Sequence, residues 1–545
     1  MNPFWSEHAI PPMRREAFFG DRLVHAFAQR APHVSALLHN ALLSHGEGVA
    51  IVDGDTRLTW TQVGERVLQL ATLLATREIN PGDRVVIWLS NRHEFVLWWL
   101  AVLWRGAVAV PVSIRESSDG VAYAIAQCQA AAICTEVSLW ARLPDAAQVP
   151  SLRQRFNVDD ARSLAANATP APVTGHQTAP GMTEAHPVGS EDVATILYTS
   201  GTTGKPKGAM LTHVNIVHSC MHFACTMGLS AQDRTLLAVP ASHVTGLIAN
   251  IATMVSVAGT IIIQREFKAA DFLALAAREG MTHTLMVPAM YKLLLMQAEF
   301  ARTDLSAWRV GGYGGAPMPV STIDAMAQAL PRLVLLNTYG ATETTSPTTT
   351  MPPGLTRAHI DSVGVPLPCA RVAVMDDEGR ELPPGEVGEI WISGPMVVKG
   401  YWDNPAATAK EFTAGWWHSG DLGSMDAQGF VRVFDRKKDM LNRGGYKIYS
   451  VEVENHLMGL AGVLEAAVVA KPCPVLGERV HVFIHAPHVQ LSVSDIQTHC
   501  AQALADYKVP ESVTWSSSLL PRNPNGKVLK RQLRERLLHD LGLSA

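Results

Sequence analysis

The segment YTSGTTGKPKG, residues 198–208, places glycines, hydroxyl side chains and two lysines together in a chain that is 47% hydrophobic. Glycines let backbone N–H groups approach an anion, hydroxyls add donors, and lysines supply positive charge. The segment therefore predicts a phosphate-binding loop. It is not a Walker A loop, because that pattern requires Ser or Thr after the lysine, whereas Lys205 is followed by Pro206. Taken alone, a polar loop without a ligand is the alternative.

Four more segments carry residue types that suit work on a nucleotide. They are YGATE at 339–343, HSGD at 418–421, DRKKDMLNRGGYKI at 435–448 and PRNPNGK at 521–527. Together with the first segment, and in this order, they resemble the adenylate-forming superfamily, which includes acyl-CoA synthetases, luciferases and peptide-synthetase adenylation domains. The resemblance extends over nearly the whole chain. It implies an enzyme that activates a carboxylic acid with ATP.

The resemblance implies an ATP site. The first segment would hold the β- and γ-phosphates of the leaving group, the turn at 314–317 would let the backbone approach the adenine, and a carboxylate would bind the ribose hydroxyls. The implied ATP-binding residues are Thr199, Ser200, Gly201, Thr202, Thr203, Gly204, Lys207, Gly315, Ala316, Pro317, Tyr339, Gly340, Asp421 and Arg436.

Two residues of the YGATE segment are implied in the chemistry itself. Thr342 would offer a hydroxyl to the α-phosphate. Glu343 would be the ligand of Mg²⁺, a cation that prefers hard oxygen ligands. Without the motif, the simpler interpretations are a packed aromatic residue at Tyr339 and a solvated carboxylate at Glu343.

The resemblance gives the C-terminal part its own roles. Lys527 would bridge the substrate carboxylate and the α-phosphate in the transition state, where two anions meet and fixed positive charge helps. Lys530 is the alternative if the register of the motif is shifted. Lys438 is implied as the hinge about which the C-terminal domain rotates, and Gly445 and Lys447 as residues that bind coenzyme A.

Four segments are implied as the walls of the acyl pocket: 241–247, 286–291, 311–317 and 338–347. Apart from Glu343, they contain no Asp, Glu, Lys or Arg, so a charged substrate tail would be left unpaired at considerable cost. An uncharged fatty or aromatic acid is therefore the expected substrate.

His243 lies in the first of these segments, where relatives place a His or an aromatic residue near the substrate carboxylate. It is therefore a candidate catalytic residue, and a packed core histidine is the alternative. Amino-acid-activating relatives use an Asp early in the pocket, and PASHVTG lacks one. This argues against a peptide-synthetase domain.

Three functions compete. The first is an ATP-dependent acid:CoA ligase that releases AMP and pyrophosphate. The second is a stand-alone adenylating enzyme that loads an acyl carrier protein; the chain shows no carrier-domain serine motif after Lys527, which favours free coenzyme A. The third is an inactive module that binds a nucleotide or acyl-CoA. Thr342, Glu343, Asp421, Arg436 and Lys527 are all present, which favours an active enzyme.

Alternating helix-like and strand-like segments predict the α/β fold that must position these residues. We expect a large N-terminal domain, residues 1–435, of helix-covered mixed or parallel sheets with a small antiparallel sheet between about 363 and 433. A small mobile α+β domain, residues 436–545, should follow. Thr59 is predicted to cap a helix, and residues 161–189 are predicted to form a loop or linker.

The composition excludes other classes of protein. A net charge of −4 gives no electrostatic basis for nucleic-acid binding. Seven scattered cysteines indicate reduced thiols and a cytoplasmic location. Residues 244–263 are uncharged and about long enough to span a bilayer, but Asn250 and the β-branched end favour a buried helix that runs into a core strand.

Overall fold

The computed structural model describes residues 4–5, 10–160, 184–199, 205–522 and 527–543. The chain forms two compact units, Met1–Val372 with Ile392–His418, and Ala373–Trp391 with Ser419–Ala545. Mixed α/β architecture in a large and a small unit confirms the predicted fold class. The predicted domain boundary at residues 435 and 436 lies inside the second unit. It stays a prediction.

A nine-stranded sheet lies in the first unit, in the order β17-β16-β15-β14-β13-β11-β12-β3-β4. The strands from β15 to β3 in this order run parallel, so their carboxyl ends lie at one edge of the sheet. The strands are β3 (Val49–Asp53), β4 (Thr56–Thr59), β11 (Arg234–Leu237), β12 (Thr260–Ile263), β13 (His283–Met286), β14 (Val310–Gly314), β15 (Val334–Tyr339), β16 (Thr349–Thr350) and β17 (Val365–Pro366).

A six-stranded sheet in the same unit has the order β10-β9-β6-β5-β7-β8. Its strands are β5 (Arg84–Trp88), β6 (Val108–Pro111), β7 (Ala132–Thr135), β8 (Gln154–Asn157), β9 (Val193–Thr199) and β10 (Lys207–Thr212). β9 and β10 pair antiparallel, with Thr199 opposite Lys207. The predicted phosphate loop is therefore the connection of this hairpin.

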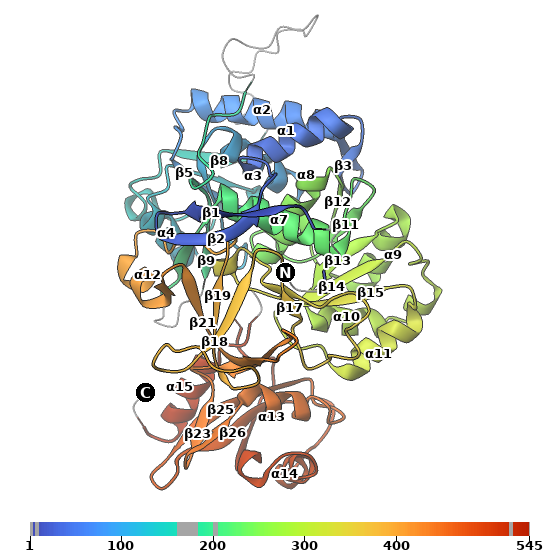
Figure 1. Cartoon of the computed structure of the whole chain (residues 1–545), viewed down its shortest axis with the longest axis vertical. Helices are drawn as coiled ribbons and strands as arrows, with labels where there is room; N and C mark the ends of the chain where they lie inside the picture. Colours follow the sequence, from blue (N-terminus) through green and yellow to red (C-terminus); the bar gives the residue numbers. More distant parts are fainter. Residues whose placement is uncertain (1–3, 6–9, 161–183, 200–204, 523–526, 544–545) are drawn as a thin grey trace, which may run out of the picture. The chain divides into compact units, whose positions relative to one another are not determined.

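The N-terminal helices follow their sequence signals. Thr59 caps α2 (Trp60–Thr76): its side chain accepts a hydrogen bond from the backbone N–H of Gln62, at 3.3 Å, which confirms the predicted cap. α3 (His93–Trp104) is almost wholly buried, and Gly106, with φ +73°, ends the turn before β6. α1 (Val34–His45), α2 and α3 pack against one another (Figure 1).

The uncharged segment 244–263 is buried in the first unit. It forms a π-helix, η2 (Thr245–Ala252), then α8 (Thr253–Val257) and β12. The prediction of a buried helix that runs into a core strand is confirmed, although its first part is a π-helix. Across the residues that the structure describes, no helix is long and apolar enough to cross a membrane.

Further elements of the first unit are shorter or cover the sheets. They are β1 (Met13–Phe18), β2 (Arg22–Phe27), α4 (Ser118–Cys128), α5 (Val137–Trp140), η1 (Ala146–Gln148), α7 (His213–Met227), α9 (Ala269–Glu279), α10 (Pro288–Leu295), η3 (Phe300–Arg302), α11 (Val320–Ala329), η4 (Thr342–Thr344), α12 (Pro405–Glu411) and β20 (Phe412–Thr413).

The second unit contains most of a small antiparallel sheet and a C-terminal α+β module. The first comprises β18 (Arg371–Met375), β19 (Gly388–Ser393), β21 (Trp416–Met425) and β22 (Val431–Arg436). The module comprises β23 (Leu441–Arg443), β24 (Tyr446–Ile448), α13 (Ser450–Leu457), β25 (Glu465–Cys473), β26 (Gly477–His485), α14 (Val493–Ala501), η5 (Asp506–Lys508), β27 (Ser512–Trp515) and α15 (Lys530–Asp540).

The sequence VSDIQTHCAQALADY predicts a helix over residues 493–507, and α14 is shorter than this. The helical pattern extends to Tyr507, but the helix ends at Ala501. The helix cannot continue through Ala505, because this residue has φ −59° and ψ 149°, outside the helical region. Residues 506–508 form a separate 3₁₀ turn instead.

Buried histidines make the fold sensitive to acid. Burial lowers the pKa of His218 and His283 to about 4 and of His222 to about 3. Neither ring nitrogen of His222 or of His283 has a hydrogen-bond partner among the described atoms. These side chains are therefore held neutral in the folded protein.

Thermal stability is expected to fall as the pH is lowered from about 6.5 towards 4. Above 6.5 these histidines are neutral in both states and cost nothing. Between about 6.5, the usual pKa in an unfolded chain, and the lower folded pKa, protonation favours unfolding, by up to roughly 3 kcal/mol for each residue. The measurement is the midpoint of thermal unfolding at each pH. A midpoint that stays constant from pH 7 to pH 5 would contradict this.

Candidate active site

The carboxyl ends of four neighbouring strands carry the predicted acyl-pocket segments. Residues 241–247 follow β11, 286–291 leave β13, 311–317 leave β14 and 338–347 leave β15. These strands are consecutive in the sheet order β15-β14-β13-β11. The fold therefore brings all four segments to one edge of the sheet, where open α/β sheets bind ligands.

The predicted turn at 314–317 needs its glycines. A Cβ on Gly314 would lie 2.2 Å from the carbonyl oxygen of Thr338, and Gly315 has φ +78°. Gly315, Ala316 and Pro317 are exposed at the strand end. Tyr339, half-buried at the end of the adjacent β15, and exposed Gly340 lie next to this turn in the sheet. The turn thus presents backbone at the predicted adenine site.

Glu343 is buried in η4, with 7% of its surface exposed. Its Oε1 accepts hydrogen bonds from Thr199 Oγ1, at 3.2 Å, and from the Tyr401 hydroxyl, at 3.0 Å. The backbone N–H of Val398 donates to the Glu343 carbonyl, at 2.9 Å. The side chain is therefore not a solvated carboxylate. A carboxylate beside a hydroxyl is the hard-oxygen donor set that Mg²⁺ prefers, so these residues fit the ion. Thr342 is half-buried beside Glu343 in η4.

Lys207 joins the same cluster from β10, 7% exposed. Its ammonium group forms an ion pair with Glu411 and lies 4.3 Å from the centre of the Tyr401 ring. The Tyr401 hydroxyl also contacts Glu411 Oε2, at 2.5 Å. Burial and the charge of Glu343 raise the pKa of Tyr401 far above its usual value, so the hydroxyl keeps its proton.

The sequence alone did not indicate Tyr401 or Glu411 as site residues. Tyr401 lies 58 residues from Glu343, and Glu411 lies 204 residues from Lys207. No periodic pattern or recognised motif links them, and each contact depends on the fold. The contact between Tyr401 and the predicted metal ligand Glu343 can therefore be recognised only in the folded structure.

His243 lies in the turn after β11 and is half-buried. Burial lowers its pKa to about 4, so the imidazole is neutral at physiological pH. The backbone N–H of Thr245 donates to Nδ1, at 3.3 Å, which leaves the ring hydrogen on Nε2. A neutral imidazole in this tautomer can donate a hydrogen bond to a substrate carboxylate.

In the second unit, Asp421 on β21 and Arg436 on β22 are opposite each other in the strand pair. Asp421 is buried, and its Oδ1 lies 2.6 Å from Arg436 Nε. The backbone N–H of Asp421 donates to Ser419 Oγ, at 3.0 Å. The two predicted ribose-binding residues therefore belong to one charged pair.

Lys527 belongs to the same part of the second unit. The positive charge of Arg436, followed by desolvation, lowers its pKa to about 8, and Asp421 opposes this shift. Lys527 is nevertheless exposed at the surface. Lys530 differs: its ammonium pairs with Glu454, at 2.7 Å, and donates to Ser450 Oγ, at 2.5 Å.

The predicted hinge and coenzyme A residues are exposed. Lys438 lies in the turn at 437–439 after β22. Gly445, with φ +93°, and Lys447 belong to the β23–β24 hairpin, where the Gly445 N–H donates to Asn442 Oδ1, at 3.0 Å.

The structure thus gathers the predicted residues into groups within each unit. In the first unit, Thr199, Lys207 and Glu343 meet, and the 315–317 turn lies beside Tyr339 and Gly340. The predicted phosphate-binding residues Ser200, Gly201, Thr202, Thr203 and Gly204 lie outside the described residues.

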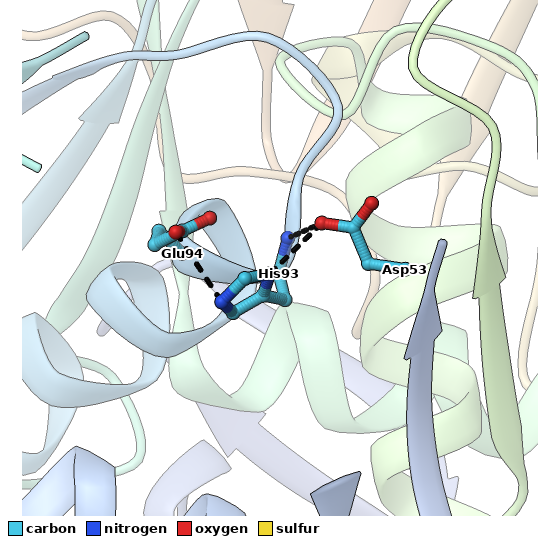
Figure 2. A group of neighbouring side chains, drawn as sticks. All are labelled: Asp53, His93 and Glu94. Carbon is cyan, nitrogen blue, oxygen red and sulfur yellow. Dashed lines mark hydrogen bonds and ion pairs between the residues drawn. The ribbon is translucent and has the colours of Figure 1, made fainter. Parts of the chain in front are cut away.

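Another polar cluster, of Asp53, His93 and Glu94, lies in the first unit at the start of α3 (Figure 2). Asp53 Oδ2 accepts from the His93 backbone N–H, at 3.1 Å, and lies 2.8 Å from its Nδ1, while Glu94 Oε1 lies 3.2 Å from Nε2. Arg92 pairs with Glu94, at 2.7 Å. Because the two carboxylates face opposite ring nitrogens, the arrangement fits a capping network rather than a metal centre.

Comparison with known proteins agrees with this geometry. Residues 38–402 match the family model for the AMP-binding enzyme, and residues 452–527 match the model for the AMP-binding enzyme C-terminal domain. The chain is 34% identical to a feruloyl-CoA synthase of Amycolatopsis sp, over 93% of this chain and 97% of that protein. It is 30% identical to a long-chain-fatty-acid–CoA ligase of Mycobacterium tuberculosis, over 88% of this chain and 93% of the relative.

The fold is also similar to that of a solved coenzyme A synthetase. The O-succinylbenzoate coenzyme A synthetase of Bacillus subtilis, in complex with ATP and magnesium ion, has a TM-score of 0.82 and 28% identity, and the match covers 93% of this chain and 100% of that one. The chain belongs to the AMP-binding enzyme family. It is an acid–thiol ligase of the AMP-forming kind.

Proposed function

We propose that this enzyme is an ATP-dependent carboxylic acid:coenzyme A ligase. It joins the acid to AMP with release of pyrophosphate, then transfers the acyl group to the thiol of coenzyme A with release of AMP. The observation that carries this proposal is the position of half-buried Thr199 between buried Lys207 and buried Glu343: its hydroxyl lies 3.4 Å from the Lys207 carbonyl oxygen and 3.2 Å from Glu343 Oε1. Here a hydroxyl donor, a positive charge and a hard oxygen ligand lie beside the predicted phosphate loop.

In the first half-reaction, the carboxylate attacks the α-phosphorus of ATP and pyrophosphate leaves. Thr199 and Lys207 bind the leaving phosphates, and Thr342 donates to the α-phosphate. Glu343 would hold Mg²⁺, which neutralises phosphate charge when bound. Tyr339 and the 315–317 turn bind adenine. Most of the rate enhancement comes from positioning and fixed charge.

The second unit supplies the remaining groups. Asp421 and Arg436 bind the ribose, and Lys527 bridges the carboxylate and the α-phosphate. Rotation about Lys438 then withdraws Lys527 and brings Gly445 and Lys447 to the coenzyme A thiol. Such a domain rotation is an ordinary gating step in enzymes.

The acid is proposed to be uncharged, fatty or aromatic. The four segments at the strand ends carry no charged residue other than Glu343, and neutral His243 would donate to the carboxylate. The relatives named above include a feruloyl-CoA synthase and a long-chain-fatty-acid–CoA ligase, so both classes belong in the test. The cytoplasm, as expected from the sequence, is the proposed location.

Pyrophosphate release is expected to depend on one class of acid. The measurement uses ATP and Mg²⁺ with a panel of fatty, branched, alicyclic and aromatic acids, each with and without coenzyme A. We expect one class of acid to give the highest rate, because the pocket selects acids by shape. Coenzyme A should be needed for repeated turnover, because its thiol reacts with the acyl-adenylate and so frees the active site. A dicarboxylic acid that outperforms every uncharged acid would contradict the proposed pocket.

A carrier protein is the second candidate acceptor. The chain is 32% identical to a fatty acid–[acyl-carrier-protein] ligase of Streptomyces coeruleorubidus, over 89% of this chain and 92% of that protein. Turnover that ignores coenzyme A but requires a phosphopantetheinylated protein would identify this acceptor instead.

A further inference from the structure

We propose that Tyr401 and Glu411 are positioning residues that couple magnesium at Glu343 to the release of Lys207 towards the phosphates of ATP. This inference rests on the proposed function. It assigns a task to two residues that no sequence motif indicated, and every contact that carries it lies within the first unit.

The cluster is continuous from the predicted metal ligand to the predicted phosphate ligand. Tyr401 lies 3.0 Å from Glu343 Oε1 and 2.5 Å from Glu411 Oε2 through one hydroxyl. Glu411 pairs with Lys207, whose ammonium also lies over the Tyr401 ring. Residues from η4, β10 and α12, with Tyr401, therefore share one network, in which Glu411 is half-buried and the others are buried.

The number of protons makes the two carboxylates interdependent. A tyrosine hydroxyl has one proton to donate, yet two carboxylate oxygens lie within hydrogen-bond distance of it. Tyr401 can therefore donate a full hydrogen bond to Glu343 or to Glu411, but not to both at once. Any change in the charge carried by one carboxylate therefore alters the hydrogen bond to the other.

The charges of the network explain why magnesium would favour the release of Lys207 from Glu411. The network contains two carboxylates and one ammonium group, of which only Glu411 pairs with Lys207. Glu343, Glu411 and Lys207 therefore carry a net charge of −1, which favours a divalent cation. The Tyr401 hydroxyl already lies closer to Glu411, at 2.5 Å, than to Glu343, at 3.0 Å. With magnesium held by Glu343, this carboxylate would no longer compete for the proton, and Tyr401 would donate it to Glu411 alone. That hydrogen bond compensates Glu411 for the loss of its ion pair, and Lys207 can turn to the phosphates.

Tyr401→Phe is the central variant. It removes the hydroxyl but keeps the ring against which Lys207 packs. The readout is the affinity for α,β-methylene ATP, measured calorimetrically with and without Mg²⁺, with no acid or coenzyme A present. We expect Mg²⁺ to strengthen binding to the unchanged protein and the variant to lose about tenfold of that gain, within the range of about 5- to 150-fold typical of coupling between sites.

Glu411→Gln tests the other end of the network, and Glu279→Gln is its control. Glu279 is also a buried carboxylate of the first unit, paired with Arg57, at 2.7 Å, and Arg234, at 3.1 Å. We expect Glu411→Gln to reduce the magnesium-dependent gain. Glu279→Gln should lower the unfolding temperature and leave that gain unchanged. The variant Tyr401→Phe/Glu411→Gln should lose no more than the stronger single variant, because both act on one exchange.

Several results would overturn the proposal. Equal loss of affinity with and without Mg²⁺ would show a merely structural role for Tyr401, and additive losses in the double variant would show independent sites. If the unchanged protein does not bind the analogue at all, both this inference and the proposed function are wrong. If it binds the analogue with the expected coupling but activates no acid, only the proposed function is wrong.

Discussion

Replacement of Lys527 by alanine is expected to slow acyl-adenylate formation by roughly 10²- to 10³-fold, the usual cost of losing one preorganised charge at a transition state. Lys527 is exposed and lies beside the Asp421–Arg436 pair. Because an exposed side chain contributes little to folding, the free energy of unfolding should change by no more than about 0.5 kcal/mol. The measurement is the rate of pyrophosphate release with saturating acid and ATP.

Two controls make this result specific. Acyl-adenylate supplied to Lys527→Ala should still react with coenzyme A at the rate of the unchanged enzyme. Lys530→Ala should behave oppositely, because it leaves half-buried Glu454 without its cation and so lowers the unfolding temperature while adenylation continues. If Lys530→Ala stops adenylation and Lys527→Ala does not, the assignment of Lys527 is wrong.

Lys438→Pro is expected to separate the two half-reactions. Proline fixes φ and restricts the residue before it, so it should prevent rotation about this position. The backbone N–H groups of Lys437, Asp439 and Met440 donate hydrogen bonds, whereas among the described residues no such bond from Lys438 is present. The substitution therefore removes no described backbone hydrogen bond, and adenylation should stay within a few-fold of the unchanged enzyme.

Thioester formation should fall by about 10²-fold or more, since even a small misplacement of reacting groups has a cost of this size. The measurement is transfer of a preformed acyl-adenylate to coenzyme A in a single turnover, with Lys438→Ala as the control that keeps backbone freedom. Equal loss of both half-reactions in Lys438→Pro would exclude a hinge at this residue.

Several elements of the fold could be predicted from local sequence patterns. The helix capped by Thr59 and the buried segment from 244 to 263 lie where polarity and periodicity placed them. These predictions succeeded because each depends on residues a few positions apart. α14 ended early, at Ala501, because the backbone leaves the helical region at Ala505, although residues 502–505 contain no Gly or Pro that would signal this.

The candidate site was predictable in its motifs and not in its contacts. Resemblance indicated Glu343 and Lys207, but the carboxylate of Glu411 and the hydroxyl of Tyr401 reach them from distant parts of the chain. Such partners depend on strand order and on which faces meet, and neither is written in local sequence. Similarly, the low pKa of His243 follows from burial that only the folded chain creates.

The most direct test of the proposed ligase is to identify the products of a single turnover by mass spectrometry, with the preferred acid, ATP and Mg²⁺. Without coenzyme A, we expect acyl-AMP and pyrophosphate; on addition of coenzyme A, the acyl-AMP should be converted to acyl-CoA and AMP. Formation of ADP and phosphate, or of acyl-CoA without a prior acyl-AMP, would contradict the proposed two-step ligase mechanism.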